Sequence, residues 1–222
     1  MNALRRTLVV LAAMVLFAAP AFADGKLLFA GVRMDPTDAD ARNYSRPGWG
    51  GSVELVAPLP IPEKLVAGVF GLDFVNLLSK THKFRDPLTG LRVEQQTEQH
   101  YVRVFAGGQF GSHSRGLLRP YAGANVAAVF YGISTDVVVP DDNIRENEIR
   151  QNLRDENEAA FGWDANVGID FNFNDAFSID AGVRVLHSYG VPQQLGADAV
   201  TIQPSYVMYK VGVAIPLHRM MH

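Results

Sequence analysis

Acidic, basic and amide residues recur at alternate positions of residues 160–188, and these residue types favour ion pairing over catalysis. The polar positions that carry charge or amide groups are Asp164, Asn166, Asp170, Asp180 and Arg184. Alternate residues of an extended strand point to the same side, so the pattern predicts a β-hairpin with one polar face. Buried charges must be paired, because removing one partner of a buried pair costs about 3–5 kcal/mol. The polar face therefore predicts either a salt-bridged plug or a gated polar conduit.

A histidine and a serine are adjacent near the end of this stretch, and these are common base and nucleophile types in acyl hydrolases. Adjacent residues of a strand point to opposite faces, so His187 and Ser188 are predicted to lie outside the roughly 3 Å reach that the chemistry needs. The other histidines stand singly and give no metal-ligand spacing. No phosphate-binding loop or dinucleotide-binding glycine pattern is present. The sequence predicts no catalytic residues, no metal and no cofactor.

The segment Pro140–Glu158 mixes acidic, basic and amide residues, with Ile144, Ile149 and Leu153 at semi-helical spacing. A contact with a divalent cation or with lipopolysaccharide is one interpretation of this composition. A solvated, partly disordered loop is the favoured one, because the segment lacks the ligand spacing of a calcium-binding loop.

The other face of residues 160–188 is apolar and continuous, with aromatic residues at each end. Its members are Trp163, Ala165, Val167, Ile169, Phe171, Phe173, Phe177, Ile179, Ala181, Val183 and Val185. Charges and glycines are poor material for the core of a soluble protein. This combination is typical of a barrel wall with lipid outside and a small polar interior.

Eight segments of the chain alternate between an apolar and a more polar face. Each is near the ~9–11 residues that a tilted strand needs to cross a bilayer. They are Lys26–Met34, Trp49–Leu59, Leu65–Leu78, Glu98–Gly111, Arg119–Ile133, Trp163–Phe173, Phe177–Val185 and Thr201–Leu217. The long connections alternate with short ones and are Asp35–Gly48, Ser79–Thr97, Ser134–Glu158 and Tyr189–Val200. The pattern predicts an all-β fold, an eight-stranded antiparallel up-and-down transmembrane β-barrel over residues 24–217. Its long loops would lie outside the cell and both termini in the periplasm.

The two ends and the overall composition agree with an exported membrane protein. Arg5 and Arg6, an apolar run over Thr7–Phe17 and the Ala21–Ala23 pattern predict a cleaved signal peptide over residues 1–23. Its removal takes away two Arg and no acid, which changes the net charge from −3 to −5 and argues against a nucleic-acid partner. No later run of about 20 apolar residues is present, so insertion into a membrane would require a closed barrel. Residues 218–222 are predicted to be a short periplasmic tail.

Two groups of residues follow from this barrel. The predicted interior polar network consists of Arg33, Glu54, Asp73, Arg103, Asn125, Asp164, Asn166, Asp170, Asp180, Arg184 and Lys210. In the first strand this places Arg33 inward and Leu28, Ala30, Val32 and Met34 on the other face. The predicted aromatic girdle consists of Trp49, Phe74, Phe130, Phe161, Trp163 and Tyr189 at the outer rim and Phe110, Tyr121, Phe171, Phe173 and Phe177 at the inner rim.

Three short stretches resemble the small eight-stranded outer-membrane barrels of the OmpA-type and OmpW-type superfamily. They are Arg119–Gly123 (RPYAG), Val167–Phe171 (VGIDF) and the closing Lys210–Leu217 (KVGVAIPL). The last looks like the C-terminal signal that the barrel-assembly machinery reads, although Leu217 replaces the usual terminal aromatic and five residues follow. The resemblance implies a Gram-negative outer membrane, contact with its lipid and lipopolysaccharide, and a monomer.

Several functions fit such a barrel. A structural or surface-interaction role with a plugged interior is favoured, since eight strands leave room only for side chains inside. A narrow channel for small or hydrophobic molecules is the alternative that the OmpW-type resemblance implies. The lipid A deacylase barrels use a His and a Ser on one face, and the adjacent His187 and Ser188 do not match them. A soluble barrel would need its apolar face turned inward around a ligand.

Overall fold

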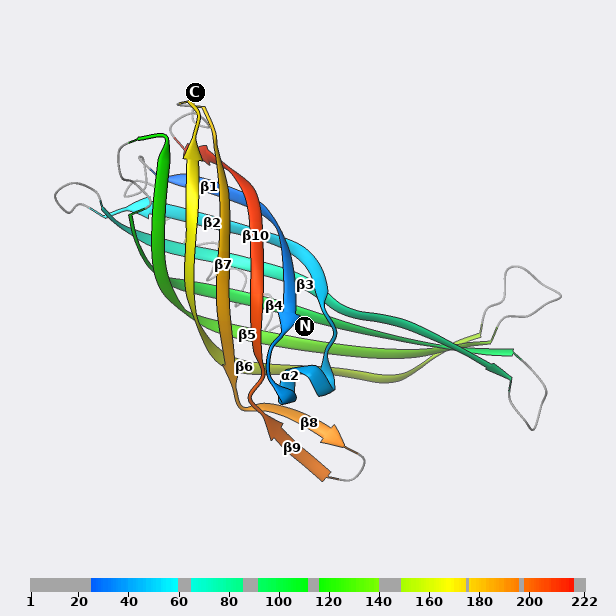
Figure 1. Cartoon of the computed structure of the whole chain (residues 1–222). Helices are drawn as coiled ribbons and strands as arrows, with labels where there is room; N and C mark the ends of the chain where they lie inside the picture. Colours follow the sequence, from blue (N-terminus) through cyan, green and yellow to red (C-terminus); the bar gives the residue numbers. More distant parts are fainter. Residues whose placement is uncertain are drawn as a thin grey trace, which may run out of the picture.

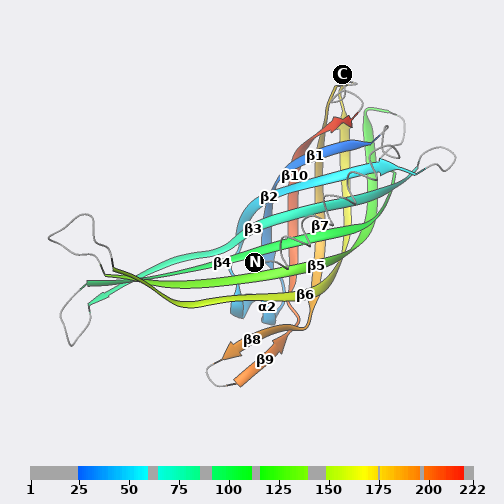
Figure 2. The same cartoon turned by 180° about the vertical axis from the view of Figure 1, so that it is seen from behind.

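The computed structural model describes residues 25–59, 65–85, 92–111, 116–139, 149–174, 176–195 and 198–217. Eight strands form a closed antiparallel barrel in the order β1-β10-β7-β6-β5-β4-β3-β2. Their bounds are β1 Lys26–Pro36, β2 Gly48–Pro58, β3 Val66–Arg85, β4 Arg92–Phe110, β5 Leu118–Val139, β6 Ile149–Asn172, β7 Ser178–Tyr189 and β10 Ser205–Pro216. Figures 1 and 2 show the barrel from two sides. The predicted fold class is confirmed, whereas the predicted signal peptide and C-terminal tail lie outside the described residues.

The barrel is closed by pairing of its first and last strands, Lys26 with Pro216. The Leu217 N–H also donates to the Gly25 carbonyl, at 2.8 Å. A row of paired residues that starts at Lys26 passes once through all the strands and returns to β1 at Pro36. This stagger of ten residues over eight strands tilts the strands and leaves an interior that side chains can fill.

The four middle strands are about twice as long as the others. β3 to β6 have 20, 19, 22 and 24 residues, against 11 or 12 in β1, β2, β7 and β10. Their extra length continues past one mouth of the barrel as a four-stranded sheet (Figures 1 and 2). We call residues 78–85, 92–99, 133–139 and 149–158 the projecting sheet.

The projecting sheet corrects the prediction that Ser79–Thr97 and Ser134–Glu158 are loops. Only 86–91 and 140–148 of these segments fall outside the described strands. The sequence lacks an apolar alternation there, because neither face of a sheet outside the barrel needs to be apolar. Backbone pairing with the neighbouring strands continues the barrel ladders instead, as in Lys80 with Thr97 and Thr135 with Arg154.

The mouth of the barrel that bears the projecting sheet also carries two elements that lie within the predicted loops. Helix α2, Ala39–Tyr44, is capped by the Asp38 carboxylate, which accepts from the Ala41 N–H at 2.7 Å. The hairpin of β8, Val191–Leu195, and β9, Asp198–Ile202, lies beside it in Figure 1. The opposite mouth carries the links of β2 to β3, β4 to β5 and β6 to β7. The predicted alternation of long and short connections is wrong at the link of β3 to β4, residues 86–91, which is no longer than the links 59–65 and 111–117, because the strands themselves continue past the mouth.

The outer wall of the barrel is apolar and exposed. Its exposed large apolar residues include Phe29, Val53, Leu72, Val126, Val167, Ile169, Ile179, Val183, Val185, Val211 and Val213. Charged residues of the same strands, including Glu54, Asp73 and Arg103, point inward and are buried. This is the reverse of a soluble ligand-binding barrel, in which the exposed wall is polar.

Candidate functional site

Arg184 on β7 is the centre of a buried ionic network in the barrel. Its Nη2 lies 3.1 Å from Oε1 of Glu54, and its Nη1 lies 3.2 Å from Oδ2 of Asp73. Its Nε lies 3.3 Å from Oδ1 of Asp164. All four side chains are at most 4% exposed. Since the three acids come from β2, β3 and β6, one guanidinium joins four different strands.

A second guanidinium reinforces this centre. Arg103 on β4 donates to Asp164 through Nη2, and its Nε lies 3.5 Å from Oδ2 of Asp73. The ring of Phe105 receives both cations, with the Cζ atoms of Arg103 and Arg184 at 4.2 and 4.5 Å from its centroid. Cation–π contacts of this kind are strongest where water is excluded. The aromatic ring therefore stabilises two like charges that lie close together.

Two lysines extend the network toward the mouth with short connections. Nζ of Lys210 lies 3.0 Å from Oε2 of Glu54 and 3.2 Å from Oδ1 of Asp180. The Tyr121 hydroxyl donates to the same Asp180 oxygen at 3.0 Å. At the end of the barrel, Lys26 on β1 forms a buried ion pair with Asp170 on β6.

The first strand faces the opposite way from the prediction. Arg33 lies on the outer wall, with 46% of its side chain exposed, pairs with Asp35 at 3.1 Å and covers the ring of Trp49. The residues of the alternate face, Leu28 to Met34, point inward and are buried. The prediction was wrong because both faces of β1 carry apolar residues, so alternation alone does not show which face points inward. Lys26 shares that inward face and was missed, although its spacing from Leu28 could have revealed it.

Amide side chains complete the interior set. Asn125 and Asn166 both donate to Oδ1 of Asp164, at 2.8 and 3.3 Å. Among the described residues the network holds five carboxylates and four cations. Such an arrangement ties strands across the bore and fills the space through which a solute would pass. Each of the eight barrel strands contributes a polar interior residue, in strand order Lys26, Glu54, Asp73, Arg103, Asn125, Asp164, Arg184 and Lys210.

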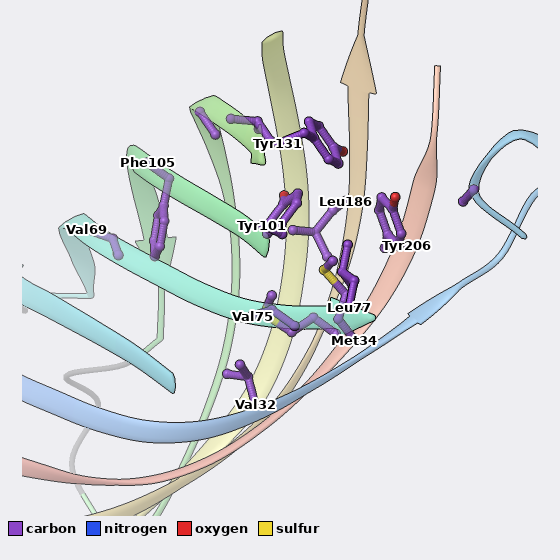
Figure 3. Packing of buried hydrophobic residues seen from close by; sticks show 14 of the residues in the cluster. Val32, Met34, Val69, Val75, Leu77, Tyr101, Phe105, Tyr131, Leu186 and Tyr206 are labelled. Carbon is purple, nitrogen blue, oxygen red and sulfur yellow. The ribbon is translucent and has the colours of Figure 1, made fainter. Parts of the chain in front are cut away.

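The half of the interior near α2 is apolar and aromatic (Figure 3). The ring of Tyr101 lies 5.2 Å from that of Tyr131 and 6.0 Å from that of Tyr206, and all three are buried. The hydroxyl of Tyr206 lies 3.2 Å from Oγ of Ser45, which follows α2. Alternation in the sequence places Tyr101 and Tyr206 inward, but it does not show that they meet in one layer. The remaining space is filled by Met34, Leu77, Leu186 and Met208.

The predicted girdle residues lie mostly on the outer wall. The exposed members are Trp49, Phe74, Phe110, Phe130, Phe161, Trp163, Phe173, Phe177 and Tyr189, with Trp49 the most exposed at 68%. Phe171 is half-buried. Trp163 Nε1 donates to the Tyr189 hydroxyl at 3.1 Å, which ties two rings of the mouth near the projecting sheet. Tyr121 does not belong to this set: it is buried in the interior, because the Gly168–Gly182 pair leaves space for its ring.

His187 and Ser188 point to opposite sides of β7. Ser188 is buried, and its Oγ lies 3.1 Å from the Tyr131 hydroxyl. His187 is half-buried on the other side, with Nδ1 at 2.8 Å from Oγ of Ser205. The His187 ring also contacts Tyr189 edge-to-face at 4.6 Å. Within the described residues no acid is seen to orient this imidazole, and the polar contact links β7 to β10.

The described part of the chain holds no group of three or more potential metal ligands. In the same residues, no helix has the length and apolar character needed to cross a membrane. The segment Pro140–Glu158 was predicted to be a solvated loop, with cation or lipopolysaccharide contact as the disfavoured interpretation. Its residues 140–148 lie outside the described ranges, and the rest belongs to β6.

No protein-family model matches the chain, and no curated protein matches its sequence. Solved structures do resemble it. Neisserial surface protein A has a TM-score of 0.54 at 10% identity, over 87% of this chain and 97% of that one. A major outer membrane protein from Thermus thermophilus has a TM-score of 0.50 at 12% identity, over 86% of this chain and 98% of that one. At these identities the likeness establishes the fold, which is that of the small outer-membrane barrels.

Proposed function

We propose that this chain spans the outer membrane of a Gram-negative bacterium as a closed, non-conducting barrel. Its role is structural and directed to contacts at the cell surface. The observation that carries the proposal is the filled bore: a buried ionic network and a tyrosine layer occupy it in succession. Export by the predicted signal peptide and folding by the barrel-assembly machinery belong to the same proposal.

The outer wall supports insertion into lipid. Exposed valines, isoleucines and phenylalanines cover its middle, and Trp163 and Tyr189 stand at one rim. Lipid-facing strands of outer-membrane barrels show an apolar band between two aromatic girdles. A closed barrel also satisfies the backbone hydrogen bonds that lipid cannot accept.

The interior supports a non-conducting barrel. An ion passing along the axis would have to break contacts such as Arg184 with Glu54 and then part the rings of Tyr101, Tyr131 and Tyr206. Removing one partner from a buried ionic pair costs about 3–5 kcal/mol. Helix α2 adds a further obstruction at the mouth that bears the projecting sheet, since its Ala41 belongs to the buried apolar cluster.

The surface role rests on the elements at that mouth. In a membrane, the projecting sheet, α2 and the β8–β9 hairpin would all lie on one side. That side is opposite to the end of the barrel at which Lys26 of β1 pairs with Pro216 of β10. One of the similar solved barrels is named a surface protein. A paired sheet that extends beyond the lipid is suited to contacts with other molecules.

Three measurements on the full-length chain test the proposal. We expect heat-modifiable gel mobility and a requirement for detergent, whereas a protein that remains in the periplasmic extract would disprove membrane insertion. In planar bilayers we expect no stable discrete conductance. Reproducible channels would favour the narrow transporter instead. After overexpression, the acyl pattern of lipid A should stay unchanged, and a deacylated product would establish an enzyme.

A further inference from the structure

The projecting sheet has two lateral edges that pair with no further strand among the described residues. Pairing of β2 with β3 ends at Trp49 and Asn76, although β3 continues to Arg85. Pairing of β6 with β7 begins at Phe161 and Tyr189, although β6 begins at Ile149. Free strand edges are templates for pairing with another strand, and proteins usually shield them.

The β3 edge is basic in the sequence, and the barrel end of the β6 edge is acidic. The β3 edge bears Lys80, His82, Lys83 and Arg85 and no acid over residues 78–85. The β6 edge over residues 149–158 bears Asp155, Glu156 and Glu158 together at its barrel end, and Arg150 and Arg154 nearer the tip. Opposite charges directly across a strand pair stabilise it, and like charges destabilise it.

We propose that copies of this chain pair side by side, the β3 edge of one copy with the β6 edge of the next. The inference rests on the proposed membrane location, because a membrane holds all copies upright in the same sense. In upright copies β3 runs toward the tip of the sheet and β6 runs back toward the barrel, so the two edges meet antiparallel. Two β3 edges related by an axis normal to the membrane would be parallel, with lysines facing lysines.

The stagger of the barrel sets the register of this contact. A row of paired residues that leaves β1 at Lys26 and passes through β2 and the other strands returns to β1 at Pro36. The return point is ten residues nearer the mouth that bears the projecting sheet. Four strands of the same tilt therefore shift the row by about five residues. A row through Lys80 and Arg154 of one copy then reaches the partner copy's β3 near Arg85.

Only an even shift keeps the two faces of the joined sheet continuous, because side chains alternate along a strand. A shift of about four residues places Lys80 opposite Glu158 of the partner copy and Lys83 opposite Asp155 of the partner copy. The basic and acidic stretches thus meet in one of the two even registers nearest to the shift that the strand tilt gives, and their charges favour this one. The contact is heterologous, so each copy keeps one edge free for a further copy.

Cysteine cross-linking tests this register, since the chain has no cysteine of its own. A full-length Lys80→Cys protein and a differently tagged Glu158→Cys protein are inserted together into vesicles of phosphatidylethanolamine and phosphatidylglycerol and then oxidised. We expect a disulfide-linked dimer that carries both tags. The matched control replaces Glu158→Cys by Arg150→Cys, on the same strand but eight residues away, and should give little product.

Charge reversal separates the ionic contribution from chance collisions. With Thr81→Cys and Asn157→Cys as reporters, Lys80→Glu with Lys83→Glu should lower the dimer yield roughly tenfold. Adding Asp155→Lys with Glu158→Lys to the other copy should restore it. Three outcomes would overturn the inference and leave the proposed function standing. They are cross-linking of Lys80→Cys with itself, an unchanged dimer yield after charge reversal, and no dimer from barrels that are shown to be inserted. Failure of the same samples to float with the vesicles would overturn both.

Discussion

The guanidinium of Arg184 meets the carboxylate of Asp73 across the full width of the barrel, with 3.2 Å between Nη1 and Oδ2. Their strands, β7 and β3, are separated by three strands in either direction round the ring. This ion pair therefore spans the bore, and together with Glu54 and Asp164 it fixes the relative position of opposite walls.

Replacing Arg184 by alanine should destabilise the barrel by about 3–5 kcal/mol, because three buried carboxylates lose their shared cation. The matched control is Arg33→Ala, which removes an exposed arginine paired only at the surface and should change stability by about 0–1 kcal/mol. Urea unfolding of detergent-folded protein, followed by gel mobility, measures both. Equal effects of the two substitutions would contradict the assignment of their opposite faces.

The pair of Lys26 and Asp170 should behave as a coupled unit. Lys26→Met leaves the Asp170 carboxylate buried without its cation and is expected to cost about 3–5 kcal/mol. The double variant Lys26→Met with Asp170→Leu should recover most of that loss, since it leaves no unpaired charge. A double-mutant cycle on unfolding free energies gives the coupling, and purely additive effects would rule the contact out.

Gly168 should tolerate no side chain, because a Cβ there would collide with the ring and hydroxyl of Tyr121. Overpacking of this kind typically costs about 1–3 kcal/mol, so Gly168→Ala should lower the stability by that amount. The control Gly31→Ala lies on the outer wall, where the nearest atom to a Cβ is 3.9 Å away, and should be nearly neutral. Truncating Tyr121 should relieve the Gly168→Ala effect, and failure of that relief would count against the predicted packing.

Val211 tests which solvent surrounds the wall. It is 63% exposed, and it pairs with Gly31 and Ala181 in the middle of the barrel. If lipid surrounds it, Val211→Arg should destabilise the vesicle-folded protein by about 2–4 kcal/mol. The same substitution at Asn157, in the projecting sheet, should have little effect. A neutral Val211→Arg variant would point to a wall in water.

The amino-acid sequence alone determined the architecture, because alternation of apolar and polar residues is a local property that each strand displays by itself. It identified the eight strands and placed Asp164, Asp180 and Arg184 on the inward face. It failed for β1, because both faces of that strand are apolar enough to face lipid. One face carries Phe29, and the other carries Leu28, Ala30, Val32 and Met34. It also missed the projecting sheet, whose strands have no apolar face to reveal them.

The tertiary structure decided which inward residues meet. Lys26 and Asp170 are 144 positions apart, and Arg184 and Glu54 are 130 apart. These contacts depend on the stagger of the closed barrel, which brings one level of every strand to the same height. The same stagger gathers three tyrosines, Tyr101, Tyr131 and Tyr206, into one layer beside the charges. Since alternation specifies a face but not a height, only closure of the barrel could turn separate polar and aromatic positions into a filled interior.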